Sequence, residues 1–577
     1  MALKSPEKNS NRLIVTTINS EPSQSHYHKY LKPKPLINNS QLLQLYFMEL
    51  IFIGSFLYLV NRNIYSLLNK TVSTPILVII ALFSCLTTIF WRATYLHQIK
   101  NINQAKTSGP CPKNLSVAMA TTIVPSREIE LLESKLDGML AVFLMGNKLD
   151  CWVLDEEEDP RVKELVARYD SKCHSENRRF FYFTRSGKEH YNQAASGNKY
   201  ARYQRAQKAG NINAWLNSID RDQYDIFTFL DLDHIPLPSY LQNLLPFFRD
   251  KDIGFVQGPD SFRNRNKNFI TRAASYERDA FFGIIHRCFY GLKMPIVVGS
   301  HTTFRSSALK ALGGYYPVHL TEDYLIMLQL RARKIRGVFT DQIIAVGELP
   351  ENLSSFITQQ CRWATGGLDL LLRHYFQYFK YFTWKERLYF FILLQYYAWG
   401  VFSTFGRLAF YYVVSSGLIH GLPLETIIAG VVIMIGWNFC NYAWQKQFFI
   451  EINTTRQFIE YALLSNLLSI YLFMSFISAI FHPNQPFRVT AKGKLNRAKL
   501  SRSINCYIPV IVSLSEISLI YFLIHKNSSM DLGLACILLL AGLSSFCVLA
   551  TWAIALIKES WIQKTGYSNK VNLVRAC

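Results

Sequence analysis

The feature that most constrains this chain is a set of long apolar runs on both sides of a segment of different character. Two runs come early and five come late: Leu42–Val60, Pro75–Trp91, Leu388–Val414, Leu424–Trp444, Ile459–Phe481, Tyr507–Ile524 and Gly533–Leu556. A helix needs about 20 residues to cross a bilayer, and these runs are close to that length. Only 18% of the residues are charged, whereas soluble domains have about 25%. Both observations argue against a purely soluble protein.

The charge of the connections between these runs predicts the topology. The connection 487–505 carries six basic residues and no acid: Arg488, Lys492, Lys494, Arg497, Lys499 and Arg502. Positive loops stay on the cytosolic side, so we expect this connection in the cytosol. The connections 415–423 and 525–532 hold almost no positive charge and are expected outside.

A count of crossings then requires one late run not to span. If the segment between the two groups of runs is also cytosolic, an even number of crossings must separate it from residue 487. We choose Ile459–Phe481 as the helix that lies at the interface or inside the bundle, because polar residues precede it and it contains Glu460. This leaves two spanning helices before the segment and four after it, with both termini inside. Seven crossings with an external loop remain the alternative.

The segment from Lys106 to Pro350 has the pattern of a soluble α/β domain. Short strand-like runs occur at Val117–Val124, Trp152–Leu154, Ile226–Leu230 and Ile253–Val256. They alternate with amphipathic helical stretches at 130–144 and 306–312. This alternation predicts a parallel sheet covered by helices.

The net charge of +22 does not by itself decide which class of partner the protein binds. A basic chain can bind nucleic acid, an anionic membrane surface or a phosphate-bearing substrate. Here the basic residues are interleaved with the apolar runs, and the basic connection is what a cytosolic loop predicts, so we expect no nucleic-acid partner. The 11 cysteines include no CxxC pair, which indicates neither a zinc site nor a redox motif.

Two carboxylates follow the third predicted strand. Ile226–Leu230 leads directly into Asp231 and Asp233, and residues i and i+2 of an extended segment point the same way. Carboxylate oxygens bind Mg²⁺ or Mn²⁺ beside substrate phosphates. A solvated strand end or an Asx turn would look the same in isolation.

Other polar residues are expected at the same edge of the sheet. Asp155 follows the second strand, and Ser126 lies just after the first. The carboxyl ends of parallel strands converge on one edge, where α/β proteins bind ligands. The stretch Lys208–Asn213 opens a helix and offers a lysine and free N–H groups to a diphosphate, although an ordinary capped surface helix is an equal alternative.

Two later motifs complete the set. Thr321-Glu322-Asp323 precedes an apolar helix, where it could also be an N-cap with acids at the positive end of the helix. Gln359, Arg362 and Trp363 lie where the chain reaches the membrane, as a membrane-anchoring interfacial helix would also place them.

In this order and between apolar runs, Asp155, Asp231-x-Asp233, Thr321-Glu322-Asp323 and Gln359-x-x-Arg362-Trp363 resemble the processive membrane glycosyltransferases of family 2. That family includes the cellulose, curdlan, chitin and hyaluronan synthases. The resemblance covers residues 113–505, and Phe487–Gly493 is similar to the FxVTxKG gating loop of bacterial cellulose synthase catalytic subunits. It implies an α/β GT-A-type (Rossmann-like) cytosolic domain inserted in an α-helical transmembrane bundle of about six spanning helices plus interface helices.

The expected domains follow from this resemblance and from the runs. They are a basic cytosolic tail (1–40), two transmembrane helices (41–98), the glycosyltransferase domain (106–350), interface helices with QxxRW (351–385), a transmembrane hairpin (386–446), an interface helix and gating loop (447–505), a second hairpin (506–557) and a cytosolic tail (558–577). The last tail is too short for a cyclic-di-GMP-binding PilZ domain.

The resemblance also implies a role for each matching residue. Ser126, Asp155 and Lys208 would bind the nucleotide sugar, together with Asp231 and Asp233, which would act through Mg²⁺ or Mn²⁺. Asp323 would be the general base that deprotonates the acceptor hydroxyl. Gln359, Arg362 and Trp363 would hold the diphosphate and the acceptor sugar. The gating loop would act through Phe487, Val489, Thr490 and Lys492.

The expected product is a β-glucan made from UDP-glucose by an inverting reaction and exported through the bundle, with a growing polysaccharide as acceptor. The expected localisation is the plasma membrane, and accessory export subunits are further candidate partners. The sequence departs from the family at two places: the first strand ends in VPSRE rather than VPTYNE, and Val297–Ser300 replaces the family's FFCGS. The sugar and the linkage therefore stay open. The alternatives are β-1,4, β-1,3 and mixed-linkage glucans and chitin-, hyaluronan- or mannan-like products. A transporter or scaffold with a degenerate domain is the non-enzyme alternative.

Overall fold

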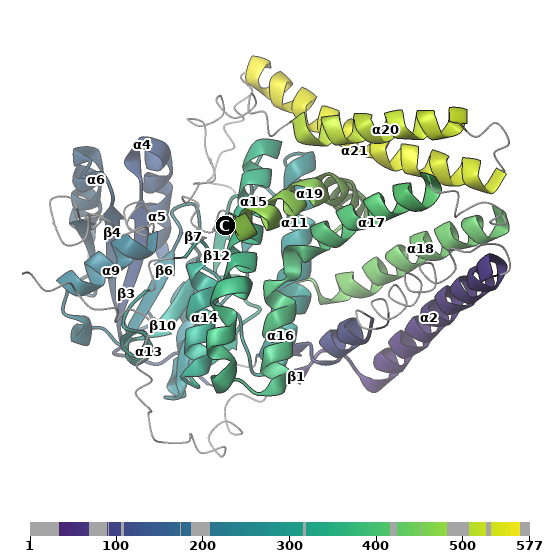
Figure 1. The fold of residues 1–577 in the computed structure, drawn as a ribbon. Helices are drawn as coiled ribbons and strands as arrows, with labels where there is room; N and C mark the ends of the chain where they lie inside the picture. Colours follow the sequence, from purple (N-terminus) through teal and green to yellow (C-terminus); the bar gives the residue numbers. More distant parts are fainter. Residues whose placement is uncertain are drawn as a thin grey trace, which may run out of the picture.

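A computed structural model of the protein describes residues 34–68, 89, 92–105, 109–173, 175–185, 208–315, 319–415, 424–451, 453–481, 507–526 and 532–565. Three predicted parts lie wholly or mostly outside these ranges: residues 1–33 of the first tail, nearly all of the run Pro75–Trp91, and the four gating-loop residues Phe487, Val489, Thr490 and Lys492. In Figure 1 an α/β domain forms one end of the molecule and long helices extend from the other.

The α/β domain is built on a seven-stranded sheet in the order β11-β8-β10-β6-β3-β4-β5. Its strands are β3 (Ser116–Ile123), β4 (Lys148–Asp155), β5 (Arg178–Thr184), β6 (Ile226–Leu230), β8 (Ile253–Gln257), β10 (Thr302–Arg305) and β11 (Arg336–Phe339). Every residue of β6 and β8 is buried, which is why these strands read as continuous apolar runs rather than alternating ones. All four predicted strands are present.

The expectation of a wholly parallel sheet is wrong at β10. This strand is antiparallel to both neighbours, β6 and β8, whereas β3 pairs parallel with β4 and β6. The reason lies in the connection from β8 to β10. It leaves the sheet at the carboxyl end of β8 and returns at the same edge, since Thr302 pairs with Gln257, so β10 must run backwards.

Two small sheets and short helices complete this domain. The small sheets are β7 (Ile235–Pro236), β12 (Ala345–Gly347) and β9 (Ser261–Phe262), and β1 (Lys34–Pro35) with β2 (Asn103–Gln104). The helices are α4 (Pro125–Glu128), η1 (Ile129–Leu131), α5 (Leu132–Ala141), α6 (Pro160–Ser171), α9 (Lys208–Ser218), η2 (Arg221–Gln223), α10 (Tyr240–Leu244), η3 (Leu245–Arg249), α13 (Ser306–Leu312) and α14 (Glu322–Ala332). Both predicted helical stretches, 130–144 and 306–312, therefore contain helices.

The core of the domain is aromatic beside the central strands. Trp215 of α9 is fully buried, and its ring meets Phe227 and Phe229 of β6 edge-on. Aromatic pairs of this geometry stabilise by about 1 kcal/mol beyond the area they bury. The packing fixes α9, and with it Lys208 at its start, against the strand that ends at Asp231.

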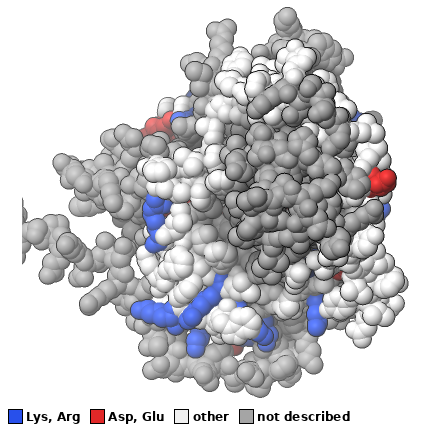
Figure 2. Space-filling view, turned by 45° about the vertical axis from the view of Figure 1, so that its right-hand side comes forward, with Lys and Arg blue, Asp and Glu red and all other residues white. Residues whose placement is uncertain are grey.

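Between the sheet and the long helices lie α11 (Phe269–Ala280), the π-helical turn η4 (Phe281–His286), α12 (Arg287–Gly291), α15 (Leu353–Arg373), η5 (Tyr375–Tyr381) and α16 (Trp384–Leu394). The long helices are α2 (Asn39–Leu68), α17 (Trp399–Ser415), α18 (Leu424–Gln445), α19 (Thr455–Phe481), α20 (Ile508–Lys526) and α21 (Leu532–Thr565), with the short turns η6 (Tyr396–Ala398) and η7 (Lys446–Phe448). Figure 2 views the molecule from nearer this end, and most of the described surface there is uncharged.

Among the described residues, five helices are long and apolar enough to cross a membrane, or six if the bent pair at Trp384–Leu394 and Tyr396–Arg407 forms one span. All five expose large apolar side chains, for example Leu50 of α2, Val432 of α18 and Leu539 of α21. Apolar surface of this extent has no place in water.

Helix α19, which contains the run that we expected not to span the membrane, is more buried than the other four candidate spans. Half of its most apolar window is buried inside the molecule, against 11–28% for the other four helices. It packs against α11, α15, α17 and α21, and Figure 1 shows it at the centre of the helices. Because α19 is also long and apolar enough to span, the number of crossings stays a prediction.

Candidate active site

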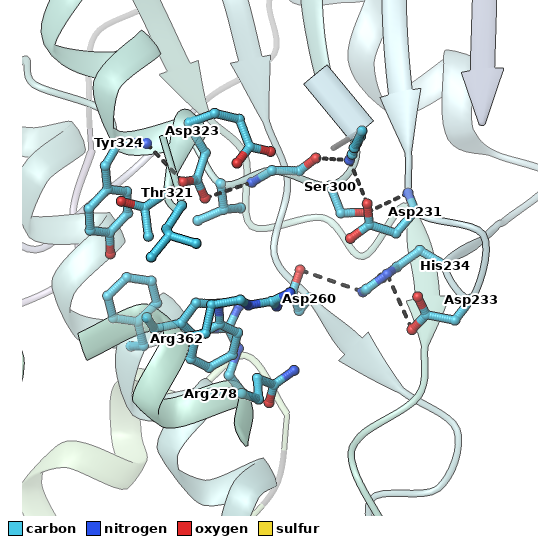
Figure 3. A pocket seen from close by; sticks show the side chains of 18 of the residues that line it. Asp231, Asp233, His234, Asp260, Arg278, Ser300, Thr321, Asp323, Tyr324 and Arg362 are labelled. Carbon is cyan, nitrogen blue, oxygen red and sulfur yellow. Dashed lines mark hydrogen bonds and ion pairs between the residues drawn. The ribbon is translucent and has the colours of Figure 1, made fainter. Parts of the chain in front are cut away.

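A cavity of about 280 Å³ opens at the carboxyl edge of β3 and β6. One end is lined by strand ends, including Thr122 and Asp231, and the other by Tyr396 and Tyr397 at the bend between α16 and α17. Figure 3 shows Asp231 and Asp323 on one wall and Arg278 and Arg362 on the facing wall. The cavity therefore joins the edge of the sheet to the start of the long helices.

Asp231 lies at the sheet side of this cavity beside a lysine. Lys208 Nζ is 2.5 Å from Asp231 Oδ1 and also donates to the carbonyl oxygen of Gly299. The backbone N–H of Asp231 donates to Ser300 Oγ over 3.2 Å. Burial works to raise the pKa of Asp231, but the Lys208 ammonium and His234 outweigh burial and lower this pKa. Asp231 is therefore a carboxylate at neutral pH.

Asp231, Asp233 and His234 each offer a ligand atom within 4.8 Å of the others. His234 Nδ1 is 3.6 Å from Asp233 Oδ2. Two carboxylates fit Mg²⁺ or Mn²⁺, and an imidazole can add a nitrogen ligand. We did not predict His234 from the sequence, although its position directly after Asp233 was a usable signal.

A buried lysine supports the turn that carries these residues. Lys135 of α5 is fully buried, and its Nζ donates to the carbonyl oxygens of Asp231 (3.1 Å) and His234 (2.5 Å). Burial lowers the pKa of Lys135 to about 7. The Lys135 side chain thus stabilises the turn through these two hydrogen bonds. No pattern near Lys135 in the sequence predicts this contact.

Asp323 stands at the start of α14 with both oxygens oriented. Oδ2 accepts from the N–H of Gly299 over 3.0 Å, and Oδ1 accepts from the N–H of Tyr324 over 2.9 Å. Burial raises the pKa of Asp323, and it raises that of the adjacent Glu322 to about 7 with help from the charge of Asp323. A raised pKa makes a carboxylate a stronger base for a bound hydroxyl group.

Thr321 does not act as the simple helix cap that its sequence context allows. It occupies the N-cap position of α14 without a side-chain cap. Its hydroxyl instead meets His319 Nδ1 at 3.0 Å.

Gln359, Arg362 and Trp363 line the cavity from α15. Spacings of three and four residues place side chains on one face of a helix, and this face looks toward Asp323. Burial lowers the pKa of Arg362, yet an arginine stays charged at any physiological pH. Gln360 lies on the neighbouring face and donates to Glu277 Oε2 over 2.7 Å.

Two predicted residues do not line the cavity. The Asp155 carboxylate is buried and accepts from the N–H groups of Glu157 and Asp159 (2.9 and 2.7 Å) and from Tyr182 Oη (3.0 Å). Ser126 is exposed, and both its N–H and its hydroxyl donate to Glu157. In the protein alone both residues shape the loop after β4, so their contact with a nucleotide stays a prediction.

Comparison with known proteins relates part of the chain to a known family. Residues 226–442 match the family described as Glycosyl transferase family group 2. Over 167 residues the chain is 29% identical to a UDP-forming cellulose synthase catalytic subunit of Dictyostelium discoideum, and the matched segment covers 28% of this chain and 16% of that protein. A solved mannosyltransferase, PcManGT from Pyrobaculum calidifontis in complex with GDP-Man and Mn²⁺, is 12% identical with a TM-score of 0.42, over 76% of this chain and 99% of that chain.

The chain thus carries a glycosyltransferase domain of GT-A type joined to a helical bundle, and the predicted fold class is confirmed. Residues 226–442 match glycosyltransferase family 2, and the segment aligned with the cellulose synthase subunit is similar to it, in line with the resemblance that the motifs carry. The matched segment includes Asp231, Asp323 and Arg362.

Proposed function

We propose that this protein is a processive, inverting glycosyltransferase of the membrane that polymerises a β-glucan from UDP-glucose, with β-1,4 linkage favoured. The observation that carries the proposal is one cavity in which Asp231, Asp323 and Arg362 face one another and which continues to Tyr397. A soluble single-transfer enzyme needs no such continuation into a group of apolar helices.

The donor would lie across the carboxyl edge of the sheet. Lys208 and Arg362 would bind its diphosphate, and arginine can do so with two parallel hydrogen bonds. Asp231, Asp233 and His234 would hold Mg²⁺ or Mn²⁺, which when bound neutralises charge on the departing UDP. Lys135 keeps these three residues in place through the backbone of their turn.

Asp323 would be the general base. The N–H groups of Gly299 and Tyr324 fix its two oxygens, and burial raises its pKa, so the carboxylate can take the proton of the acceptor hydroxyl as that oxygen attacks the anomeric carbon. Attack from the side opposite UDP converts an α-linked donor into a β-glycoside in one step. No covalent enzyme intermediate is required.

The acceptor would lie toward Trp363, Tyr396 and Tyr397. A flat aromatic ring fits the C–H face of a sugar, and tyrosine hydroxyls can bond to its hydroxyl groups. An uncharged polymer with many hydroxyls cannot cross lipid unaided. We propose that the helices beyond the bend guide the polymer outward, with the domain at 106–350 and both termini in the cytosol of a plasma-membrane protein and residues 487–493 as a gating loop.

The test is incorporation of radiolabelled UDP-glucose into insoluble polymer by membranes that contain the protein, with Mg²⁺ or Mn²⁺ present. Digestion of the product by a β-1,4-specific glucanase is the expected result. Digestion by a β-1,3-specific enzyme instead would correct the linkage. Polymer made only from UDP-N-acetylglucosamine or GDP-mannose would reject glucose, and no polymer from any of the three donors would contradict the proposal.

A further inference from the structure

His234 lies between two carboxylates, and only one of them belongs to the predicted metal site. Its Nδ1 is 3.6 Å from Asp233 Oδ2, and its Nε2 is 3.8 Å from Asp260 Oδ1. The imidazole is 7% exposed, and neither ring nitrogen has a hydrogen-bond partner among the described residues. A histidine that binds a metal through one nitrogen commonly donates the other N–H to a carboxylate, which fixes the ring. Asp260 is in the place of that carboxylate (Figure 3).

Asp260 is itself held from its other side. Its Oδ2 accepts from Arg278 Nη2, and its Oδ1 is 3.4 Å from His301 Nε2. The side chains of Asp260 and Arg278 are only 8% and 13% exposed. A buried ion pair is strongly destabilised when one partner is removed, because the other charge stays behind without a counter-ion.

Arg278 also reaches the acceptor end of the cavity. Its guanidinium carbon is 5.0 Å from the centroid of Trp363 and 4.9 Å from that of Phe282. Cation–π contacts of this length contribute about 1 kcal/mol or more when they are shielded from water. Arg278 closes the last turn of α11, which continues directly into the π-helical turn η4. One side chain therefore touches both the partner of His234 and the aromatic ring on α15.

We propose that Asp260 and Arg278 are positioning residues that link the metal ligand His234 to the acceptor platform Trp363, an inference that rests on the proposed function for the roles of its two ends. Asp260 orients the His234 ring so that Nδ1 faces the site formed with Asp231 and Asp233. Arg278 holds Asp260 in that position and supports the ring of Trp363 with the same guanidinium. Neither residue belongs to the motifs that carry the family resemblance.

The primary test is a titration of purified full-length protein in detergent with Mn²⁺, without any sugar nucleotide. Electron paramagnetic resonance measures the free Mn²⁺ and so gives the Kd. The variants are Asp260→Asn and Arg278→Met. The matched control is Arg336→Met, which removes another partly buried arginine, 16% exposed, from its ion pairs with Asp250 and Asp252, away from the cavity. Loss of an outer residue that orients a ligand weakens metal binding about 10- to 100-fold.

We expect Kd for Mn²⁺ to rise at least about ten-fold in both variants and to change by less than about two-fold in Arg336→Met. At saturating Mn²⁺, Arg278→Met should also release more UDP per sugar incorporated than Asp260→Asn, because it alone removes the contact with Trp363. If Arg278→Met does not fold, Asp260→Asn, which keeps the size of the side chain, carries the Mn²⁺ test.

A wild-type Kd in folded Asp260→Asn or an equal loss in Arg336→Met would overturn the inference. A wild-type protein that binds no Mn²⁺ would overturn it as well. Because the titration contains no donor, its failure is separate from a failure of glucan synthesis.

Discussion

At the residue scale, the pair Glu322 and Asp323 predicts the pH dependence of the reaction. Burial raises the pKa of both, and the negative charge of Asp323 raises that of Glu322 further. Like charges in contact oppose each other's ionisation, so an ionised Glu322 acts in the same direction on Asp323. Only ionised Asp323 can act as a base, so the rate should fall as pH falls through its raised pKa. Replacing Glu322 by Gln removes one charge and should move this acid limb to lower pH.

The measurement is the pH profile of kcat for sugar incorporation by the wild type and Glu322→Gln. Glu133→Gln, a change at an exposed residue of α5 whose side chain is 62% accessible, should leave the profile where it is. An acid limb that stays fixed in Glu322→Gln would show that the two carboxyls do not titrate together.

A second prediction at this scale concerns Lys135. Replacement by Met fills the same space but leaves the carbonyl oxygens of Asp231 and His234 without their buried donor. A buried acceptor without a partner costs about 2 kcal/mol, so the unfolding midpoint should fall. Sugar incorporation at limiting Mn²⁺ should fall further than at saturating Mn²⁺. Equal losses at both concentrations would mean that Lys135 does not hold the metal-binding turn.

At the scale of elements, the site depends on how closely α15 approaches the loop before α14. A Cβ added at Gly366 would lie 2.5 Å from Thr321 Cγ2, far inside the roughly 3.5–4.0 Å of a normal carbon contact. Gly366→Ala must therefore push α15, with Arg362 and Trp363, away from Asp323. A displacement of about 1 Å can lower the rate about 100-fold.

Gly54→Ala is the matched control, because nothing lies within 4 Å of a Cβ at this position of α2. Sugar incorporation by the two variants, compared at equal amounts of folded protein, tests this packing. Activity of Gly366→Ala near that of the wild type would show that the distance between α15 and α14 does not limit the reaction.

The elements also show which parts of the fold a sequence can predict. Strands β6 and β8 were predictable because they are buried on both faces and therefore continuously apolar. Asp231 and Asp233 follow from the same local geometry. Strand β10 was missed because Thr302–Arg305 contains a single large apolar residue, and its direction depends on where a connection of more than 40 residues returns to the sheet.

The residues that complete the site were less accessible from sequence. Lys135 meets Asp231 across 96 positions of the chain, and Gln360 meets Glu277 across 83. Such partners are brought together only by the packing of whole elements. Conversely, Asp155 matches the expected motif, but its carboxylate is occupied by the loop after β4.

At the scale of the whole molecule, the cavity connects the carboxyl edge of the sheet with a group of apolar helices, and this connection underlies the proposed coupling of synthesis to export. Arg407 lies on α17, beyond the bend between α16 and α17. Its guanidinium contacts Asn466 and Ser469 of α19. It also lies 3.7 Å from Glu516 of α20. Charged and polar side chains inside a group of apolar helices are costly and commonly mark a polar path. In sealed inside-out vesicles supplied with external UDP-glucose, we expect the glucan in the lumen, protected from added glucanase.

The proposed function depends most directly on Asp323 as the base of a polymerising reaction. The decisive measurement compares wild type and Asp323→Asn for incorporation of UDP-glucose into insoluble polymer, at equal amounts of folded protein and with Mn²⁺ present. Loss of a general base lowers the rate about 10²- to 10⁴-fold, and we expect a loss in this range with Mn²⁺ binding retained. Polymer formed by Asp323→Asn at the wild-type rate would contradict it.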